Sequence, residues 1–210
     1  SRLHVDFIPL ESEPAGPAHE LRATKTALFK PWIASMDEGW TRLLFDTYEV
    51  PYANVSNKDV TENKIKDFGV LVLPNIRPSI IKDGKIDDDE EKRWFRPLPP
   101  EYRGGIDKKG VENLKEFVEG GGTLICFGQS CGLAIETFEL PVRNVLDKVS
   151  SDNFYCPGSI LEVSFKTDQP ITYGMPAEGH LFFANSLAFA TSVPYGKLDR
   201  SVLASYTDKA

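Results

Sequence analysis

The sequence predicts an α/β protein with a doubly wound, mostly parallel sheet and a β-rich extension toward the C-terminus. Three observations predict this fold class. Short apolar segments alternate with helical segments between residues 25 and 138, and glycine or proline separates them, as in βαβ units. The run at 68–73 is continuously apolar, which is typical of a central parallel strand that helices cover on both faces. After residue 154, short alternating segments replace this pattern.

The first unit is a strand, a turn and a helix. Residues 25–30 form the expected strand, and Pro31 ends it. Ser35 and Glu38 have the Ser-x-x-Glu spacing of a capping box, in which a hydroxyl and a carboxylate satisfy backbone amides where a helix begins. The expected helix has one apolar face, formed by side chains at helical spacing: Trp40, Leu43, Leu44 and Tyr48.

The pattern then repeats. Residues 52–55 predict a short strand, 57–66 a polar helix or turn, and 68–73 the central strand. Residues 77–105 are expected to form a long loop, whose acidic run at 87–91 is a solvated surface.

The remaining elements complete the sheet and lead into the extension. A helix is expected at 108–119, closed by glycines at 120–122, then a strand at 123–127 and a helix at 133–138. Segments such as 160–165 then predict a β-rich extension on the sheet edge.

Right-handed crossovers place the carboxyl ends of the parallel strands at one edge of the sheet, where ligands bind in such folds. The residues that follow the predicted strands are therefore candidate ligand-binding residues: Trp32, Asn75, Gly128, Gln129 and Gly132.

Composition excludes several classes of function. The 210 residues carry a net charge of −7, which argues against a nucleic-acid partner, and no apolar run is long enough to span a membrane. Residues 1–22 are expected to form a linker or N-terminal arm, and 23–210 one domain. The start at Ser1 and the absence of a closing helix after the last expected strand favour an excerpt from a longer polypeptide.

A candidate catalytic motif follows the strand at 123–127. Residues 128–132 fit Gly-x-Ser-x-Gly between a predicted strand and a predicted helix, the context of a nucleophile elbow. This spacing places Ser130 at a strained bend, with helix amides available to an oxyanion. Cys131, at the start of the helix, is a second candidate nucleophile because a thiol there can have a lowered pKa.

A serine nucleophile needs a base, and His180 is the one histidine downstream of Ser130. An ordinary surface or hydrogen-bonded histidine is the competing interpretation. The sequence has neither a P-loop nor a dinucleotide-binding motif, and the spacing of its histidines and cysteines predicts no metal site and no cofactor.

Four segments resemble the C-terminal, class I glutamine amidotransferase-like domain of bacterial zinc carboxypeptidases of the carboxypeptidase A type. They are residues 30–42 (KPWIASMDEGWTR), 99–106 (PPEYRGGI), 140–145 (LPVRNV) and 156–160 (CPGSI). The resemblance spans about residues 25–206. It implies a flavodoxin-like sheet and a secreted or periplasmic parent peptidase, whose zinc lies in a separate catalytic domain.

The sequence departs from the amidotransferase pattern at the reacting groups. Class I amidotransferases have cysteine at the elbow and end in a His-x-Glu pair, whereas this chain has Ser130, and Phe182 stands two residues after His180. We therefore expect a non-catalytic accessory domain that binds a small-molecule or peptide ligand or packs on the peptidase domain. The alternatives are a Ser130 hydrolase with His180 as base and a Cys131-dependent, amidotransferase-like enzyme.

Overall fold

A computed structural model describes residues 9–12, 23–86, 98–184, 186–193, 196 and 198–207. The acidic run at 87–91 and most of the expected N-terminal arm lie outside the described residues. Within the described part, no helix is both long and apolar enough to cross a membrane.

Four parallel strands form the central sheet, in the order β2-β1-β3-β4. Their bounds are Thr26–Phe29 for β1, Tyr52–Val55 for β2, Val70–Leu73 for β3 and Thr123–Cys126 for β4. The winding reverses between β1 and β3, as it does in the first four strands of a flavodoxin-like sheet. The predicted α/β class and the central position of the 68–73 run are confirmed.

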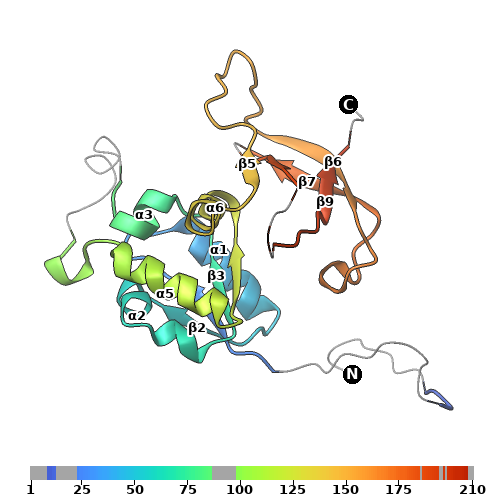
Figure 1. Cartoon of the computed structure of the whole chain (residues 1–210). Helices are drawn as coiled ribbons and strands as arrows, with labels where there is room; N and C mark the ends of the chain where they lie inside the picture. The colour runs from blue at the N-terminus through green and yellow to red at the C-terminus, as the bar shows by residue number, and fades with distance from the viewer. Residues whose placement is uncertain are drawn as a thin grey trace.

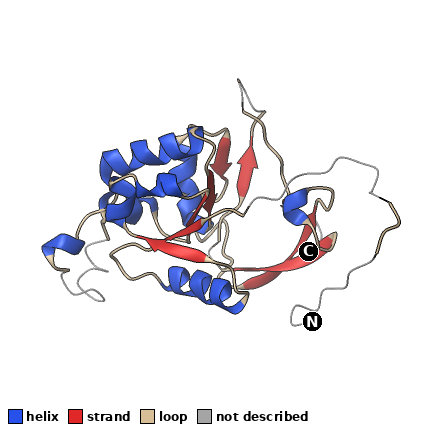
Figure 2. Cartoon of the chain, turned by 90° about the horizontal axis from the view of Figure 1, so that it is seen from below, coloured by secondary structure: helices blue, strands red, loops and turns tan. Residues whose placement is uncertain are grey.

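The helices lie on both faces of this sheet (Figures 1 and 2). Right-handed crossovers explain their placement. The connection from β1 to β2 runs toward the β2 edge of the sheet. The connections from β2 to β3 and from β3 to β4 run toward the β4 edge. Helix α1 (Met36–Thr47) therefore covers one face alone, while the opposite face carries α2 (Asn57–Thr61), the 3-10 turn η1 (Lys64–Asp67) and α5 (Asp107–Glu119).

The hydrophobic core fills the face that several helices cover. Alternate side chains of β1 and β3 point into it, among them Phe29 and Leu71, and Ile65, Leu114 and Leu133 meet them from the helical layer. All members of this core lie between residues 27 and 133. The other face buries Leu28 and Val72.

The described residues of the expected loop at 77–105 form two short elements, α3 (Pro78–Asp83) and the 3-10 turn η2 (Pro100–Tyr102). The prediction of a continuous loop is therefore wrong at these positions. Pro78 stands in the first turn of α3, and Gly84 ends it with a φ of +66°, which is a recognisable start and stop signal.

Helix α1 forms as expected, but it is turned so that its apolar side chains face solvent. Trp40 and Tyr48 are 59% and 75% exposed, whereas Glu38 is 4% exposed. The capping box is only half formed. The Ser35 hydroxyl accepts from the backbone of Glu38, but the Glu38 carboxylate pairs with Arg42 instead of returning to the N-cap.

The C-terminal extension forms two antiparallel sheets of its own. One pairs β5 (Val142–Asn144) with β8 (Phe189–Thr191), and the other has the order β7-β6-β9. Their bounds are Ser159–Phe165 for β6, Glu178–Phe183 for β7 and Ala204–Tyr206 for β9. The 3-10 turn η4 (Pro170–Thr172) lies between β6 and β7. The predicted β-rich extension is confirmed, and none of the described strands pairs with the outer edge of β4.

Candidate functional site

A crevice of about 340 Å³ opens at the carboxyl ends of the parallel strands. It lies where the winding of the sheet reverses, the position at which ligands bind in doubly wound folds, and its volume is within the roughly 300–1,000 Å³ of small-molecule pockets. The loop after β1 contributes Ser35, Met36 and Asp37, the segment after β3 contributes Asn75 and Arg77, and the turn after β4 contributes Gln129.

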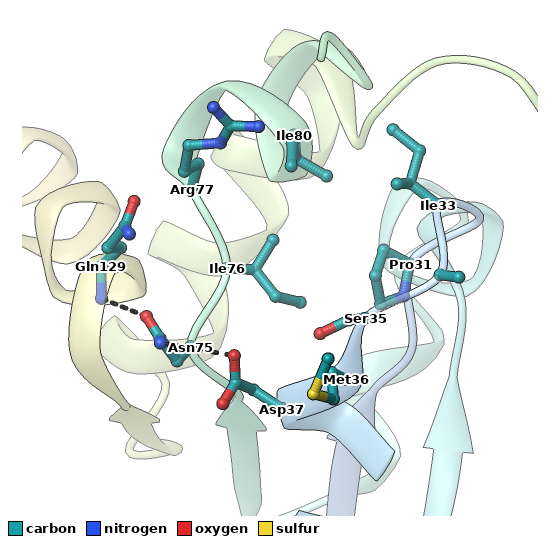
Figure 3. A pocket seen from close by; sticks show the side chains of 11 residues that line it. Pro31, Ile33, Ser35, Met36, Asp37, Asn75, Ile76, Arg77, Ile80 and Gln129 are labelled. Atoms are coloured by element: carbon teal, nitrogen blue, oxygen red, sulfur yellow. Dashed lines mark hydrogen bonds between the residues drawn. The ribbon is translucent and has the colours of Figure 1, made fainter. Parts of the chain in front are cut away.

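Asn75 connects the three segments that line this crevice (Figure 3). Its Oδ1 accepts a hydrogen bond of 2.8 Å from the backbone N–H of Gln129. Its Nδ2 lies 3.4 Å from Oδ2 of Asp37, in the first turn of α1. One amide therefore joins the ends of β1, β3 and β4, and its substitution would loosen the whole rim.

The rim carries charges of both signs. The Asp37 carboxylate and the Arg77 guanidinium both line the crevice, and Figure 3 shows them on different segments of its wall. Ile76 and Ile80 supply the apolar part of the lining. An apolar wall with a few convergent polar groups suits a small polar or zwitterionic ligand.

Gly128 is required by the turn that carries Gln129. Its φ is +51°, and a side chain at this position would collide with the amide of Asn75. Gly128 therefore allows the turn after β4 to approach the segment that carries Asn75. The ligand-binding role expected of Gly128 stays a prediction.

The bend at the Gly-x-Ser-x-Gly motif differs from a nucleophile elbow. The strained residue is Gly128, whereas Ser130 has helical angles (φ −63°, ψ −18°) between the 3-10 turn η3 (Gly128–Ser130) and α6 (Cys131–Thr137). The expectation of a strained serine is therefore wrong. The Ser130 side chain is fully buried, and its hydroxyl lies 3.1 Å and 2.8 Å from the backbone carbonyls of Leu73 and Phe127.

His180, the candidate base, belongs to a different sheet. It is exposed on β7, opposite Glu162 of β6. Both hydrogen bonds described for the Ser130 hydroxyl go to backbone carbonyls, so its proton is not directed toward an imidazole. This geometry offers no support for a catalytic pair of Ser130 and His180.

The thiols are shifted away from reactivity. Burial raises the pKa of Cys131, whose Sγ donates to the backbone carbonyl of Cys126. Burial also raises the pKa of Cys126, to about 12. The lowered pKa that a thiol at a helix start can have is therefore not realised at Cys131, because desolvation outweighs the hydrogen bond from the Cys131 backbone N–H that favours the thiolate.

Two other predicted ligand residues lie outside the lining of this crevice. Trp32 packs edge-on against Tyr102 at 5.0 Å between ring centroids, and its backbone N–H donates to Asn57. Gly132 approaches the ring of Pro78. Asn75 and Gln129 are thus the predicted residues that line the crevice.

Sequence reasoning missed Asp37 and Arg77. A usable signal was present, because both residues stand within two positions of a helix start that follows a predicted strand end. Among the described residues, no three His, Cys, Asp or Glu side chains cluster as metal ligands would.

Comparison with known proteins finds similarity among solved structures. No family model matches the sequence, and no curated protein matches it. The crystal structure of a glutamine amidotransferase from Thermotoga maritima is similar with a TM-score of 0.46 at 10% identity, over 81% of this chain and 64% of that one. That of a putative GMP synthase component from Thermoplasma acidophilum gives 0.49 at 13% identity, over 89% and 75%. The chain thus spans less than two thirds of the Thermotoga protein, and at such identities the likeness concerns the fold.

Proposed function

We propose that this chain is a non-catalytic, amidotransferase-like accessory domain of a secreted or periplasmic zinc carboxypeptidase, and that it binds a small polar ligand in the crevice around Asn75. The observation that carries the non-catalytic part is the burial of Ser130, whose hydroxyl faces two backbone carbonyls. The raised pKa of Cys131 supports this proposal, because it lowers the thiolate fraction of the second candidate nucleophile at neutral pH.

The test of the non-catalytic proposal uses the full 210-residue chain. Glutaminase and esterase assays are expected to give no turnover above buffer, and a fluorophosphonate is expected not to label Ser130. Ser130→Ala serves as the matched variant. Turnover that this variant abolishes would overturn the proposal and restore the hydrolase alternative.

Ligand binding in the crevice is supported by its position at the switch point and by the charges of Asp37 and Arg77. Thermal unfolding in a panel of free amino acids and dipeptides should reveal a ligand that raises the Tm. Asn75→Ala should remove that shift because it frees all three rim segments. Asn54→Ala, on the exposed part of edge strand β2, is the matched control. A shift that survives Asn75→Ala would exclude this crevice.

The peptidase domain is proposed to pack on the exposed apolar face of α1, which we call the α1 face. It consists of Met36, Trp40, Leu43, Leu44 and Tyr48. A contiguous apolar surface of this kind marks interaction sites in soluble proteins. We choose the peptidase domain as the partner because four segments of the sequence resemble carboxypeptidase accessory domains. The zinc would be bound by that peptidase domain.

This part is tested with the zinc-peptidase domain of the same polypeptide, produced separately. Sedimentation of the mixture should show a complex that Trp40→Lys abolishes. Tyr173→Lys, at an exposed aromatic side chain of the C-terminal extension, should leave the complex intact. The proposal fails if the two proteins sediment independently, or if mass spectrometry of the native polypeptide finds no peptidase sequence joined to this chain.

A further inference from the structure

A second and larger cavity, of about 660 Å³, lies among the strands of the C-terminal extension. Every strand of the two antiparallel sheets contributes to it, with Val142 from β5, Val163 from β6, Leu181 from β7, Phe189 from β8 and Tyr206 from β9. None of the described residues lines both this cavity and the crevice around Asn75. Its volume is that of a small-molecule site.

The lining is largely apolar and reaches solvent. Val163 is buried and forms the deep part, whereas Leu181, Phe189 and Val202 are 43%, 44% and 41% exposed. Exposed apolar side chains that gather around one cavity indicate a ligand-binding groove, because apolar surface left in water is unfavourable.

Among the described residues, Arg200 is the one charged side chain in this lining. It is exposed and therefore stands at the mouth, and among the described residues no carboxylate pairs with its guanidinium. The neighbouring Asp199 carboxylate accepts from the backbone N–H of Arg200 and is not part of the lining.

Residues with hydroxyl groups line the same cavity as the Arg200 guanidinium. Ser201 and Ser205 line the cavity, and Tyr206 lines it too, with its hydroxyl 3.4 Å from the carbonyl of Leu187. Burial raises the pKa of Tyr206, and its phenolic O–H donates to that carbonyl. The cavity therefore combines an apolar interior with a mouth that favours an anion.

We propose that this cavity binds a monocarboxylate with an apolar chain, whose chain lies among Val142, Val163 and Leu181 and whose carboxylate pairs with Arg200. A guanidinium binds a carboxylate through two parallel hydrogen bonds, which gives both orientation and affinity. A free fatty acid and the C-terminal end of an apolar peptide share this chemistry.

Isothermal titration of the full chain tests the proposal with three probes: decanoate, 1-decanol and N-acetyl-leucyl-leucine, each below its aggregation concentration. At least one of the two carboxylates should bind saturably, and the tighter one identifies the source. Arg200→Gln should weaken that carboxylate by about tenfold or more and leave 1-decanol unchanged.

Two kinds of variant complete the test. Arg143→Gln makes the same charge change on β5, next to Val142 but pointing to the opposite side of the strand, and should have no effect. Ala204→Phe, at an exposed position of the lining, should fill the cavity and weaken the binding of every probe. Val142→Phe, on β5, should have the same effect. The proposal is overturned if no carboxylate binds, if 1-decanol binds as tightly as the tighter carboxylate, or if Arg143→Gln weakens binding as much as Arg200→Gln.

Discussion

The side chain of Ser130 lies against backbone carbonyls that already have partners. The Leu73 carbonyl accepts from the backbone of Phe127, and the Phe127 carbonyl accepts from the backbone of Ser130 itself. The hydroxyl therefore adds a further hydrogen bond to a closed local network. A serine in this setting joins the turn before α6 to the end of β3.

Ser130→Ala is expected to lower the free energy of unfolding by about 1 kcal/mol, the net value of a typical buried hydrogen bond, because neither carbonyl is left unpaired. Urea unfolding measures the change. Ser79→Ala, at an exposed serine in α3, provides the control. A loss above about 3 kcal/mol would contradict this account of the network.

Two glycines of the chain should respond to alanine with opposite signs. Gly128→Ala is expected to cost roughly 1–3 kcal/mol, because φ is positive there and the new Cβ would meet Asn75. Gly39→Ala, inside α1 with no atom near the new Cβ, should stabilise by roughly 0.5–1 kcal/mol. Thermal unfolding of both variants checks the pair, and equal effects would rule out the described turn.

At the scale of the element, the short helix α2 depends on its cap. Ser56 and Asp59 form a complete capping box, and Lys64 lies 2.9 Å from the Asp59 carboxylate. Desolvation would raise the pKa of Asp59, but hydrogen bonds from Lys64 and Ser56 outweigh it and lower the pKa from 3.8 to about 2. The same ion pair raises the pKa of Lys64 to about 12.

Asp59→Asn is expected to destabilise the protein by about 1 kcal/mol at pH 7, through loss of the charged cap. A lowered folded-state pKa stabilises the fold above pH 3.8, and this contribution is lost as pH falls through about 2. The difference between wild type and variant should therefore shrink between about pH 4 and pH 2 in urea unfolding. Asp67→Asn, at an exposed aspartate in η1, is the matched control.

At the scale of the whole molecule, the chain has one large core and a smaller C-terminal cluster. The large core lies between residues 27 and 133, whereas the buried apolar side chains among the described residues of the extension are Val163 and Phe183. Because the extension buries few apolar side chains, we expect it to open locally at a lower free energy than the large core. The same sparse packing accommodates its cavity.

Amide hydrogen exchange should therefore be slowest in β1 and β3 and faster in β6 and β7. Leu71→Ala, in the fully buried part of β3, is expected to cost roughly 2–5 kcal/mol and to speed exchange in the parallel sheet alone. Val163→Ala should speed amide exchange in the C-terminal sheets alone. Matching changes in both regions with either variant would show a single cooperative unit instead.

The strands of the parallel sheet and the long helix at 107–119 could be predicted from sequence. Apolar runs and helical spacing are local patterns, and a buried parallel strand such as 70–73 has no other stable place. Asn75 and Gln129 could be placed at the edge of the sheet where ligands bind, because each follows the carboxyl end of a strand whose position the apolar pattern predicts.

Only the tertiary structure decided which way each element faces and which groups meet. The same apolar pattern that places a helix at 36–47 does not say that Trp40 turns outward and Glu38 inward, because rotation about a helix axis is set by neighbouring elements. The Gly-x-Ser-x-Gly motif fixes a bend but not the burial of Ser130, which depends on the carbonyls of Leu73 and Phe127. The cavity beside Arg200 joins strands far apart in the chain, and such long-range juxtapositions leave no local sequence pattern.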